Sequence, residues 1–482
     1  MTISNRKIAK VINSPKILLG EDRMFSSIDC ERTIARELYL EVKDLPIISP
    51  HGHTDPSWFS SNANFTNATE LLLAPDHYVF RMLYSQGIDL DKLAIANRHS
   101  QSDADPREAW RIFAQNFYLL RGTASYIWLN HVFAEVFNFE VALDNDSADY
   151  YYDKINQALA TDSFKPRALF ERFNIEVIST TESPTDELLH HKAIAKSGWK
   201  GRVISAYRPD NVVDASREDF NDSLALFGQL SNQDLGSFKS YLLAHQNRRA
   251  YFKSLGVTSS DHGHATALTA DLSPQQCETL YQKILANNFD AKDAEQFSAQ
   301  MLTEFAKMSL EDGLVMQIHA GACRNHNKFI FDKYGRDKGG DLPSATEYVQ
   351  ALKPLLDKFG NEKSLSIILF TLDETTYARE LAPMAGHYPA LKLGPAWWFN
   401  DCPEGMLRFR EQVTPSAGFY NTVGFNDDTR AFLSIPARHD MARRMDARFL
   451  ASLVAEDRLT IDEARDTIID LSYKLPKLAY KL

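Results

Sequence analysis

Residues 47–56 read IISPHGHTDP, an apolar run followed at once by two histidines one residue apart. Side chains at positions i and i+2 of a strand lie on the same face, so His51 and His53 point the same way. Two imidazoles at this spacing can converge on one metal ion at a strand end. When the pair is taken alone, polar residues in a turn are the simpler explanation. Whether the pair binds a metal therefore depends on the other residues of the chain.

Seven more apolar or β-branched runs end in polar residues in the same way. With the first, the runs cover residues 46–53, 175–184, 202–210, 256–264, 313–321, 364–373, 391–401 and 420–430. Between them, apolar residues recur every three and four positions, as in 273–289, 294–312 and 344–360, which predicts helices. Strands that alternate with helices predict a parallel sheet. Eight such units favour an α/β fold of the (β/α)8 TIM-barrel type, with the chemistry at the C-terminal ends of the strands.

Two regions are additional to a minimal barrel, namely a long and mostly helical insertion after the first strand and extra C-terminal helices. The predicted organisation is an N-terminal helical segment (1–45), the first barrel strand with its histidine motif (46–56), the insertion (57–165), the remaining barrel (166–435) and the closing helices (436–482). Thr460 and Glu463 form a candidate capping box for the last helix. A Rossmann sheet is less favoured, because no strand is followed by GxGxxG.

The composition is that of a globular protein. Of 482 residues, 44% are hydrophobic and 24% are charged, and the formal net charge of −11 argues against nucleic acid as a partner. Four cysteines without CxxC pairing fit reduced thiols. The N-terminus lacks an apolar signal core and no run of about 18 apolar residues occurs, so we expect a cytoplasmic protein with no membrane partner. A homo-oligomer stays open, since the insertion and the C-terminal helices offer surfaces for one.

Two more strand ends carry residues that suit a metal. His319 ends the run QIHAG and Asp428 ends FNDD. Together with His51 and His53 they offer three imidazoles and one carboxylate from three strand ends. This set predicts a site for one divalent ion such as Zn²⁺ or Mn²⁺.

An ordered set of motifs resembles the uronate isomerase (glucuronate isomerase) family of the metal-dependent amidohydrolase superfamily. The motifs are HGHTDP (51–56), DHYVFR (76–81), STTESPTDEL (179–188), ISAYRPD (204–210), SDHGHA (260–265), QIHAGACRNHN (317–327), GPAWWFND (394–401) and DDTRAFLS (427–434). The resemblance implies a hexuronate substrate and the interconversion of D-glucuronate with D-fructuronate, and of D-galacturonate with D-tagaturonate. It also implies one divalent metal ion, with zinc favoured and manganese, iron or cobalt as alternatives.

Two strand ends differ from those of related hydrolases, and these differences bear on the predicted number of metal ions. Two-metal hydrolases of the superfamily place a lysine after the fourth strand and a histidine after the sixth, where this chain has SSDHGH (259–264) and FTLDE (370–374). One metal is therefore favoured, and Asp261 stands where the bridging lysine would be. The missing histidine also counts against a deaminase. A metal-dependent hydrolase or deaminase and a catalytically silent sugar-acid-binding barrel remain the alternatives.

The isomerisation moves a proton from C2 to C1 through an enediol, and the substrate carries a carboxylate that arginine can bind with two parallel hydrogen bonds. Arg208, Arg324 and Arg430 are candidates for that role, with ordinary salt bridges as the alternative. Trp397 and Asp261 complete the predicted substrate-binding set, although core packing also explains a tryptophan here.

The residues His77 and Tyr78, taken alone, predict packing among aromatic side chains. The resemblance instead implies that they enter the active site from the insertion, with Tyr78 as a proton-transfer group or an oxygen ligand. Asp428, His77 and Tyr78 are therefore the predicted catalytic residues, and Asp428 has a second predicted role as a metal ligand. His264 is interpreted as a surface or loop residue.

Overall fold

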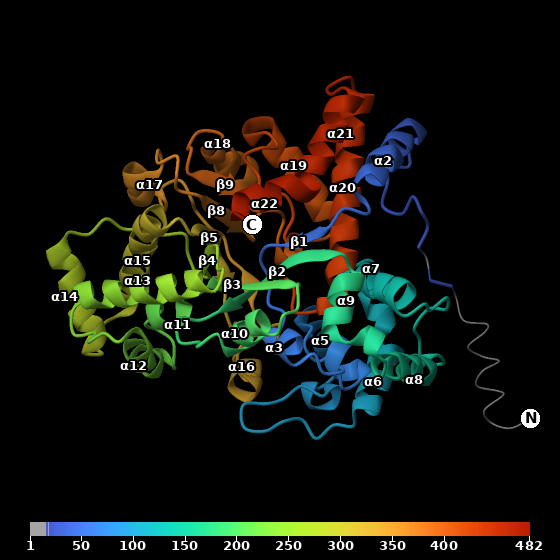
Figure 1. Ribbon diagram of the computed structural model, residues 1–482, viewed down its shortest axis with the longest axis horizontal. Coiled ribbons are helices and arrows are strands. Elements are labelled where there is room, and N and C mark those ends of the chain that lie inside the picture. The colour runs from blue at the N-terminus through green and yellow to red at the C-terminus, as the bar shows by residue number, and fades with distance from the viewer. Residues whose placement is uncertain (1–15, 18) are drawn as a thin grey trace, which may run out of the picture.

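A curled sheet of seven parallel strands forms the centre of the computed structural model, which describes residues 16–17 and 19–482 (Figure 1). The strands run in the order β1-β2-β3-β4-β5-β8-β9, and this parallel order confirms the predicted α/β class. Their bounds are β1 (Ile47–Ser49), β2 (Ile175–Glu182), β3 (Arg202–Tyr207), β4 (Ser259–His262), β5 (Val315–Ala320), β8 (Ile367–Thr371) and β9 (Leu391–Leu393). A short antiparallel pair, β6 (Ala322–Cys323) and β7 (Leu342–Pro343), follows β5.

The prediction of a regular eighth strand at 420–430 is wrong. This segment makes a single parallel bridge, between Leu393 and Thr422. Gly424 (φ 78°) and Asp428 (φ 37°) adopt left-handed backbone conformations, which interrupt an extended strand. The segment still reaches the other edge of the sheet, because the N–H of His53 donates to the carbonyl of Thr429 at 3.0 Å. It therefore lies between the two edge strands in place of a strand.

Helices lie between successive strands, and most of them cover the outer face of the sheet (Figure 1). They are α10 (Leu189–Lys196), α11 (Asp210–Val213), α12 (Phe220–Ser231), α13 (Phe238–Ser254), α14 (Pro274–Leu285), α15 (Ala291–Asp312), α16 (Lys328–Tyr334), α17 (Lys353–Phe359), α18 (Ala382–Ala385) and α19 (Pro403–Ala417). The helices predicted within 273–289 and 294–312 are confirmed. The helix predicted at 344–360 begins only at Lys353, because the Glu347 carboxylate accepts from the N–H groups of Gln350 and Ala351 in a preceding turn.

The stretch between β1 and β2 is mostly helical and packs around its own aromatic core. Its helices are α3 (Pro56–Ser61), α4 (Ala68–Leu72), α5 (His77–Ser85), α6 (Pro106–Gln115), α7 (Ala124–His131), α8 (Ala148–Leu159) and α9 (Pro166–Arg172). Trp110, Phe113, Phe133 and Tyr151 are buried at its centre. The same cluster includes Ile47 of β1, so this core is continuous with the edge of the sheet.

Helices at both ends of the chain pack together on one side of the sheet (Figure 1). They are α2 (Asp29–Val42), which lies in the predicted N-terminal helical segment, α20 (Ile435–Ala455), α21 (Ile461–Ile469) and α22 (Leu475–Tyr480). Residues 1–15 and 18 of that predicted segment lie outside the described residues. The predicted capping box at Thr460 and Glu463 is confirmed. No helix in the described part of the chain is long and apolar enough to cross a bilayer.

Tyr480 of the C-terminal helix links strand β5 to the segment that takes the place of the eighth strand. This side chain is fully buried, and its hydroxyl donates to Oε1 of Gln317 at 3.1 Å and accepts from Nδ2 of Asn426 at 2.6 Å. Gln317 lies on β5 two residues before His319, and Asn426 lies two residues before Asp428. Tyr480 therefore supports the backbone that carries both of these predicted site residues.

We expect Tyr480→Phe to lower the free energy of unfolding by about 1–3 kcal/mol, because two buried polar side chains lose their shared partner. Tyr118→Phe is the matched control, since Tyr118 is 54% exposed. Its effect should stay within about 0.5 kcal/mol. Denaturant unfolding of both variants measures the difference, and equal midpoints would contradict the role given to Tyr480.

Candidate functional site

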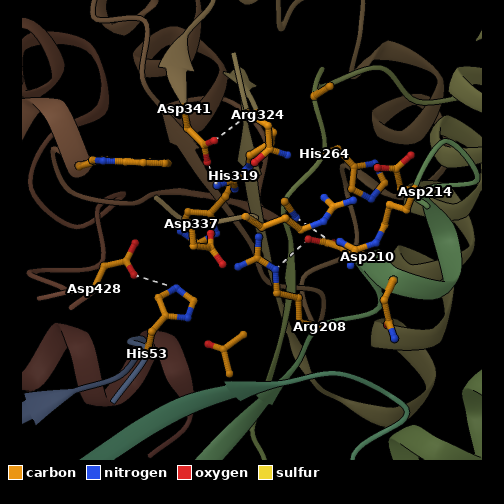
Figure 2. Close-up of a pocket in the computed structure, with 18 of the residues that line it drawn as sticks. His53, Arg208, Asp210, Asp214, His264, His319, Arg324, Asp337, Asp341 and Asp428 are labelled. Carbon is orange, nitrogen blue, oxygen red and sulfur yellow. Dashed lines mark hydrogen bonds and ion pairs between the residues drawn. The ribbon is translucent and has the colours of Figure 1, made fainter. Parts of the chain in front are cut away.

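A cavity of about 760 Å³ opens at the carboxyl ends of the parallel strands (Figure 2). Its wall is built from residues that follow β1, β3, β4 and β9, from the ends of β2 and β5, and from α5 of the insertion. The predicted site residues that line it are His51, His53, His77, Tyr78, Arg208, His319, Arg324, Trp397, Asp428 and Arg430. Asp261 is the one predicted residue that lies behind the wall.

One group of candidate metal ligands consists of His51, His53 and Asp428. Oδ1 of Asp428 lies 3.5 Å from Nε2 of His51 and 3.2 Å from Nε2 of His53. Burial lowers the pKa of both imidazoles, although the Asp428 carboxylate opposes this effect. They are therefore neutral at pH 7, which is the form of histidine that binds a metal.

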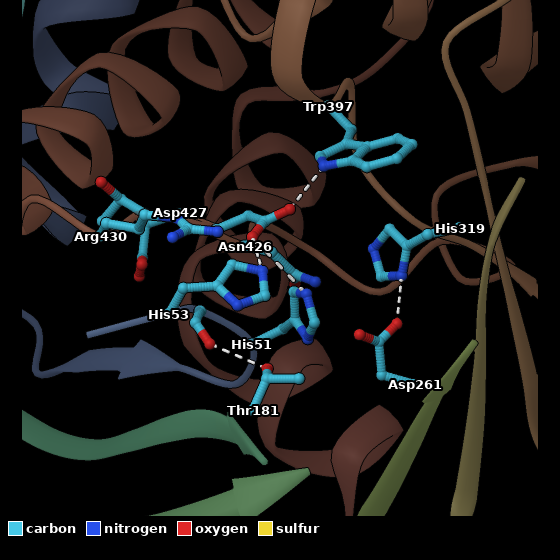
Figure 3. Close-up of polar contacts among 12 residues, drawn as sticks. His51, His53, Thr181, Asp261, His319, Trp397, Asn426, Asp427 and Arg430 are labelled. Carbon is cyan, nitrogen blue, oxygen red and sulfur yellow. Dashed lines mark hydrogen bonds and ion pairs between the residues drawn. The ribbon is translucent and has the colours of Figure 1, made fainter. Parts of the chain in front are cut away.

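A second group consists of His51, Asp261 and His319. The rings of His51 and His319 stack with centroids 4.7 Å apart, and Nδ1 of His319 hydrogen-bonds Oδ1 of Asp261 at 2.6 Å (Figure 3). Among the described residues, Nδ1 of His51 and Nε2 of His319 are buried without a hydrogen-bond partner. Buried polar atoms without partners are rare, so these nitrogens fit a site that holds a cation or a substrate oxygen.

The predicted four-ligand set is therefore divided between two groups that share His51. Three of its members, His51, His53 and Asp428, meet at one point, while His319 meets Asp261 instead. His319 lies on β5 with its Nδ1 fixed by the carboxylate behind it, so only Nε2 is left for the cavity. The donor atoms fit one divalent metal ion, because histidine nitrogens and a carboxylate oxygen within 4.8 Å of one another can converge on it.

The Asp428 side chain is held in a strained backbone position. Its φ of 37° is left-handed, and such conformations cost of order 1–3 kcal/mol and cluster at functional sites. Nε1 of Trp397 donates to Oδ2 at 2.5 Å, so Oδ1 faces the two histidines. Burial by itself would raise the pKa of Asp428, but His51 and His53 hold it far below its ordinary value. The Asp428 carboxylate is therefore ionised at pH 7.

Arg208 is held from behind by two carboxylates, of which Figure 2 shows Asp210. Its Nε donates to Oδ2 of Asp210 at 2.7 Å, and its Nη1 lies 3.0 Å from Oδ2 of Asp261. These carboxylates outweigh the burial of the guanidinium, so the pKa of Arg208 stays above its ordinary value. Asp261 is fully buried and also binds His319, so the structure puts it in contact with two cavity residues and away from the cavity itself.

The other two predicted arginines are also paired with carboxylates of the protein. Nη1 of Arg324 donates to Oδ2 of Asp341 at 2.9 Å, and the guanidinium lies over the ring of Trp398. Nη2 of Arg430 lies 3.2 Å from Oδ2 of Asp337. The side chain of Asp341 is 6% exposed and that of Asp337 is 48% exposed, so the partner of Arg430 is the more accessible of the two.

His77 and Tyr78 enter the cavity from the first turn of α5. The helix starts here because the Asp76 side chain caps it by accepting from the N–H of Tyr78. The two rings stack with centroids 5.1 Å apart. Burial lowers the pKa of His77 to about 3, so this imidazole is neutral at pH 7. The hydroxyl of Tyr78 donates to Oδ2 of Asp401 at 3.1 Å.

Several residues of the site were missed from the sequence. Asp210 and Asp401 end motifs that were recognised, ISAYRPD and GPAWWFND, so a signal was present. No motif points to the other two residues, because Asp337 lies in a glycine-rich loop and Arg438 lies in a C-terminal helix. His264 was assigned to a surface or loop: it lies in a loop, but it lines the cavity and is only partly exposed. The N–H of Gly263 donates to Asp210, which holds this loop over the cavity.

Comparison with known proteins identifies the family. Residues 24–479 match the family model described as glucuronate isomerase. A uronate isomerase of Phenylobacterium zucineum is 65% identical over 464 residues, which are 96% of this chain and 97% of that protein. The crystal structure of glucuronate isomerase from Caulobacter crescentus superimposes with a TM-score of 0.96 at 62% identity over 97% of both chains. A uronate isomerase structure from Thermotoga maritima gives 0.89 at 26% identity, covering 96% of this chain and 99% of that one.

The chain belongs to the glucuronate isomerase family. This family interconverts uronates, so the chain is an isomerase and the resemblance seen in the motifs is confirmed. The solved members also confirm the TIM-type architecture that the alternating strands and helices predicted. The two His/Asp groups of the cavity fit the metal dependence expected of this fold, and they leave the identity of the metal open.

We expect Gly263→Ala to impair uronate turnover without unfolding the protein. A Cβ at this position would lie 2.1 Å from Nη2 of Arg208 and 2.7 Å from Oδ2 of Asp210. The guanidinium has to move, and kcat/KM should fall by roughly tenfold to a hundredfold. Gly20→Ala is the control, because no atom lies within 4 Å of its added Cβ. Steady-state kinetics and melting temperatures test this, and wild-type kinetics in Gly263→Ala would show that Arg208 needs no fixed position.

Proposed function

We propose that the chain interconverts D-glucuronate with D-fructuronate, and D-galacturonate with D-tagaturonate, by moving one proton between C2 and C1 through an enediol. The observation that carries this proposal is the position of an ionised carboxylate, Asp428, in a cavity that also holds Tyr78 and the three arginines predicted to bind a carboxylate. A base for a C–H proton, a group for the oxygens and cations for a carboxylate are the elements that the reaction requires.

In this proposal Asp428 takes the proton from C2 of the open-chain aldose and returns it to C1. The electrons of the C2–H bond form the C1–C2 double bond of the enediol, and the return of the proton to C1 leaves the ketone at C2. Removal of the C2 proton leaves the negative charge on O1. Tyr78 then receives the proton of O2 and passes one to O1, so the proton count of the enzyme is unchanged. His77, neutral and stacked on Tyr78, packs the phenol against the cavity.

The substrate carboxylate is proposed to bind the arginines of the cavity. Arg208 is the best-fixed of them, since Asp210 and Asp261 hold its guanidinium from behind. Arg324 and Arg430 also line the cavity, each with its own carboxylate partner, and Trp397 contributes an aromatic wall beside Asp428. A planar guanidinium fits a carboxylate in a way that lysine does not.

One divalent cation is proposed to bind at His51, His53 and Asp428, with zinc favoured and manganese, iron or cobalt as alternatives. When bound, it would supply positive charge that attracts the oxygens of the substrate and polarises its carbonyl group. His319 completes the set either as a fourth ligand or as a contact of the substrate through Nε2, which has no partner among the described residues.

Ketose formation is the direct test of the proposed reaction. The purified protein should convert both D-glucuronate and D-galacturonate to ketoses, while neutral aldoses of the same configuration should react at least tenfold more slowly, because they lack the carboxylate. A panel of amides and lactones tests the hydrolase and deaminase alternatives. Release of an acid or amine from that panel, with no ketose from either uronate, would reject the proposal.

Metal content separates the two candidate ligand groups. His51→Ala should lose most of the bound metal, because His51 belongs to both groups. His53→Ala and Asp428→Asn should also lose it, whereas Asp261→Asn should keep more metal than either of these. His387→Ala, which changes an exposed histidine, is the control. Elemental analysis gives the comparison, and the ligand assignment is wrong if Asp261→Asn empties the site while His53→Ala does not.

A further inference from the structure

A buried carboxylate lies directly behind Tyr78. Oδ2 of Asp401 accepts the phenolic hydrogen at 3.1 Å and also accepts from Nη1 of Arg438 at 3.0 Å. Asp401 is 7% exposed and Arg438 is 1% exposed, and neither belongs to the cavity wall. Asp401 follows β9, Tyr78 begins α5 and Arg438 lies on α20, so three distant parts of the chain meet at this oxygen.

The ring of Tyr78 is fixed by contacts that do not involve Asp401. His77 stacks on it at an interplanar angle of 13°, and Trp128 meets it edge-on with centroids 5.7 Å apart. The Arg438 guanidinium lies 5.2 Å from the centre of this ring and 3.6 Å from the centre of the Trp128 ring. Aromatic packing therefore sets the position of the phenol, while the carboxylate sets the direction of its O–H bond.

The electrostatic surroundings leave Asp401 able to gain and lose a proton. Burial raises its pKa to about 7, although Arg438 and Tyr78 act in the opposite direction. Burial also raises the pKa of the Tyr78 phenol well above its ordinary value, so the phenol stays protonated unless the proton is passed on. The other charged or titratable groups that act on this cluster are Asp76 and Arg81 from α5, Cys402 beside Asp401, Asp427 and Asp428.

We propose that Asp401 is a positioning residue for Tyr78, which directs the phenolic hydrogen away from the substrate and stores that proton during the exchange between O2 and O1. The inference rests on the proposed function of Tyr78. As O2 releases its proton to Oη of Tyr78, the original phenolic proton passes to Oδ2 of Asp401. Asp401 then returns its proton to Oη of Tyr78, and Tyr78 delivers one proton to O1. No proton is gained or lost overall, and no further reactant is needed.

A direct consequence is a pH dependence that runs through Asp401. The carboxylate has to be ionised to receive the proton, so kcat should rise with pH between roughly pH 6 and 8, around its raised pKa. In Asp401→Asn the side chain can no longer take a proton. We expect kcat to fall on the order of tenfold to a hundredfold, KM for D-glucuronate to change less than about threefold, and the rise with pH to disappear.

Asp446→Asn is the matched control. Asp446 is also 7% exposed and is bound to a buried arginine, since Nε and Nη2 of Arg410 donate to its two oxygens at 2.7 and 3.1 Å. It lies on α20, as Arg438 does, and contacts no residue assigned to the reaction. Removing its charge should reduce the melting temperature and leave kcat and its pH dependence unchanged.

The inference is tested by comparing kcat and its pH dependence between the wild type and the variants at Asp401 and Tyr78. Asp401→Asn should add no further loss of kcat in a Tyr78→Phe background, because both changes break one relay. Additive losses, or an Asp401→Asn pH profile like that of wild type, would overturn it. If Asp401→Asn does not fold, the pH profile of Tyr78→Phe tests the relay, since the rise of kcat with pH must vanish in that variant too.

The failure of the inference can be told apart from the failure of the proposed function. A wild-type protein that forms no ketose refutes the proposed function, whereas an active wild type with an unaffected Asp401→Asn refutes only the role of Asp401.

Discussion

The fully buried carboxylate of Asp261 is the constraint on which the site depends. It is bonded to Nδ1 of His319 and paired with Arg208, so one side chain fixes an imidazole and a guanidinium on neighbouring strand ends. An unpaired charge in this position would cost several kcal/mol, which forces both partners to stay in place. Asp261 also fixes which atoms of the two partners remain for the cavity, namely Nε2 of His319 and the outer N–H groups of Arg208.

Support for the opposite side of the cavity comes from outside the sheet. The segment that replaces the eighth strand has to turn through left-handed conformations to present Asp428, and a regular strand would not hold that residue there. Tyr480 and His439 stabilise this segment, the first through Asn426 and the second through Asp427. The C-terminal helices therefore contribute to the geometry of the site, although they contribute few side chains to the cavity.

The sequence predicted the parts of the site that follow from the geometry of a parallel sheet. His51, His53 and His319 end apolar runs, and the carboxyl ends of parallel strands meet at one edge, so their convergence could be expected. Their division into two groups could not, because it depends on which nitrogen of His319 faces Asp261. The contact of Tyr78 with Asp401 spans 323 positions and has no local pattern. The missing eighth strand has a local cause in Gly424 and Asp428, but αL conformations of aspartate are not readable from composition.

Charge balance gives an independent reason to expect a cation in this cavity. The acidic residues that line it are Asp76, Glu182, Asp210, Asp214, Glu295, Asp337, Asp341 and Asp428, and the arginines are Arg208, Arg217, Arg324, Arg336 and Arg430. Burial raises the pKa of Asp76 and raises that of Glu182 to about 7, but carboxylates outnumber guanidiniums even without these two. Burial also keeps the imidazoles of His51 and His53 neutral at pH 7.

An anionic uronate would thus enter a cavity whose own side chains carry an excess of negative charge when the carboxylates are ionised. Coulomb repulsion in a partly buried site is weakly screened, and the five arginines do not fully offset the carboxylates. A divalent cation at His51, His53 and Asp428 would reverse the local sign next to the base. Its positive charge would also favour the negative charge that develops on the substrate oxygens in the enediol.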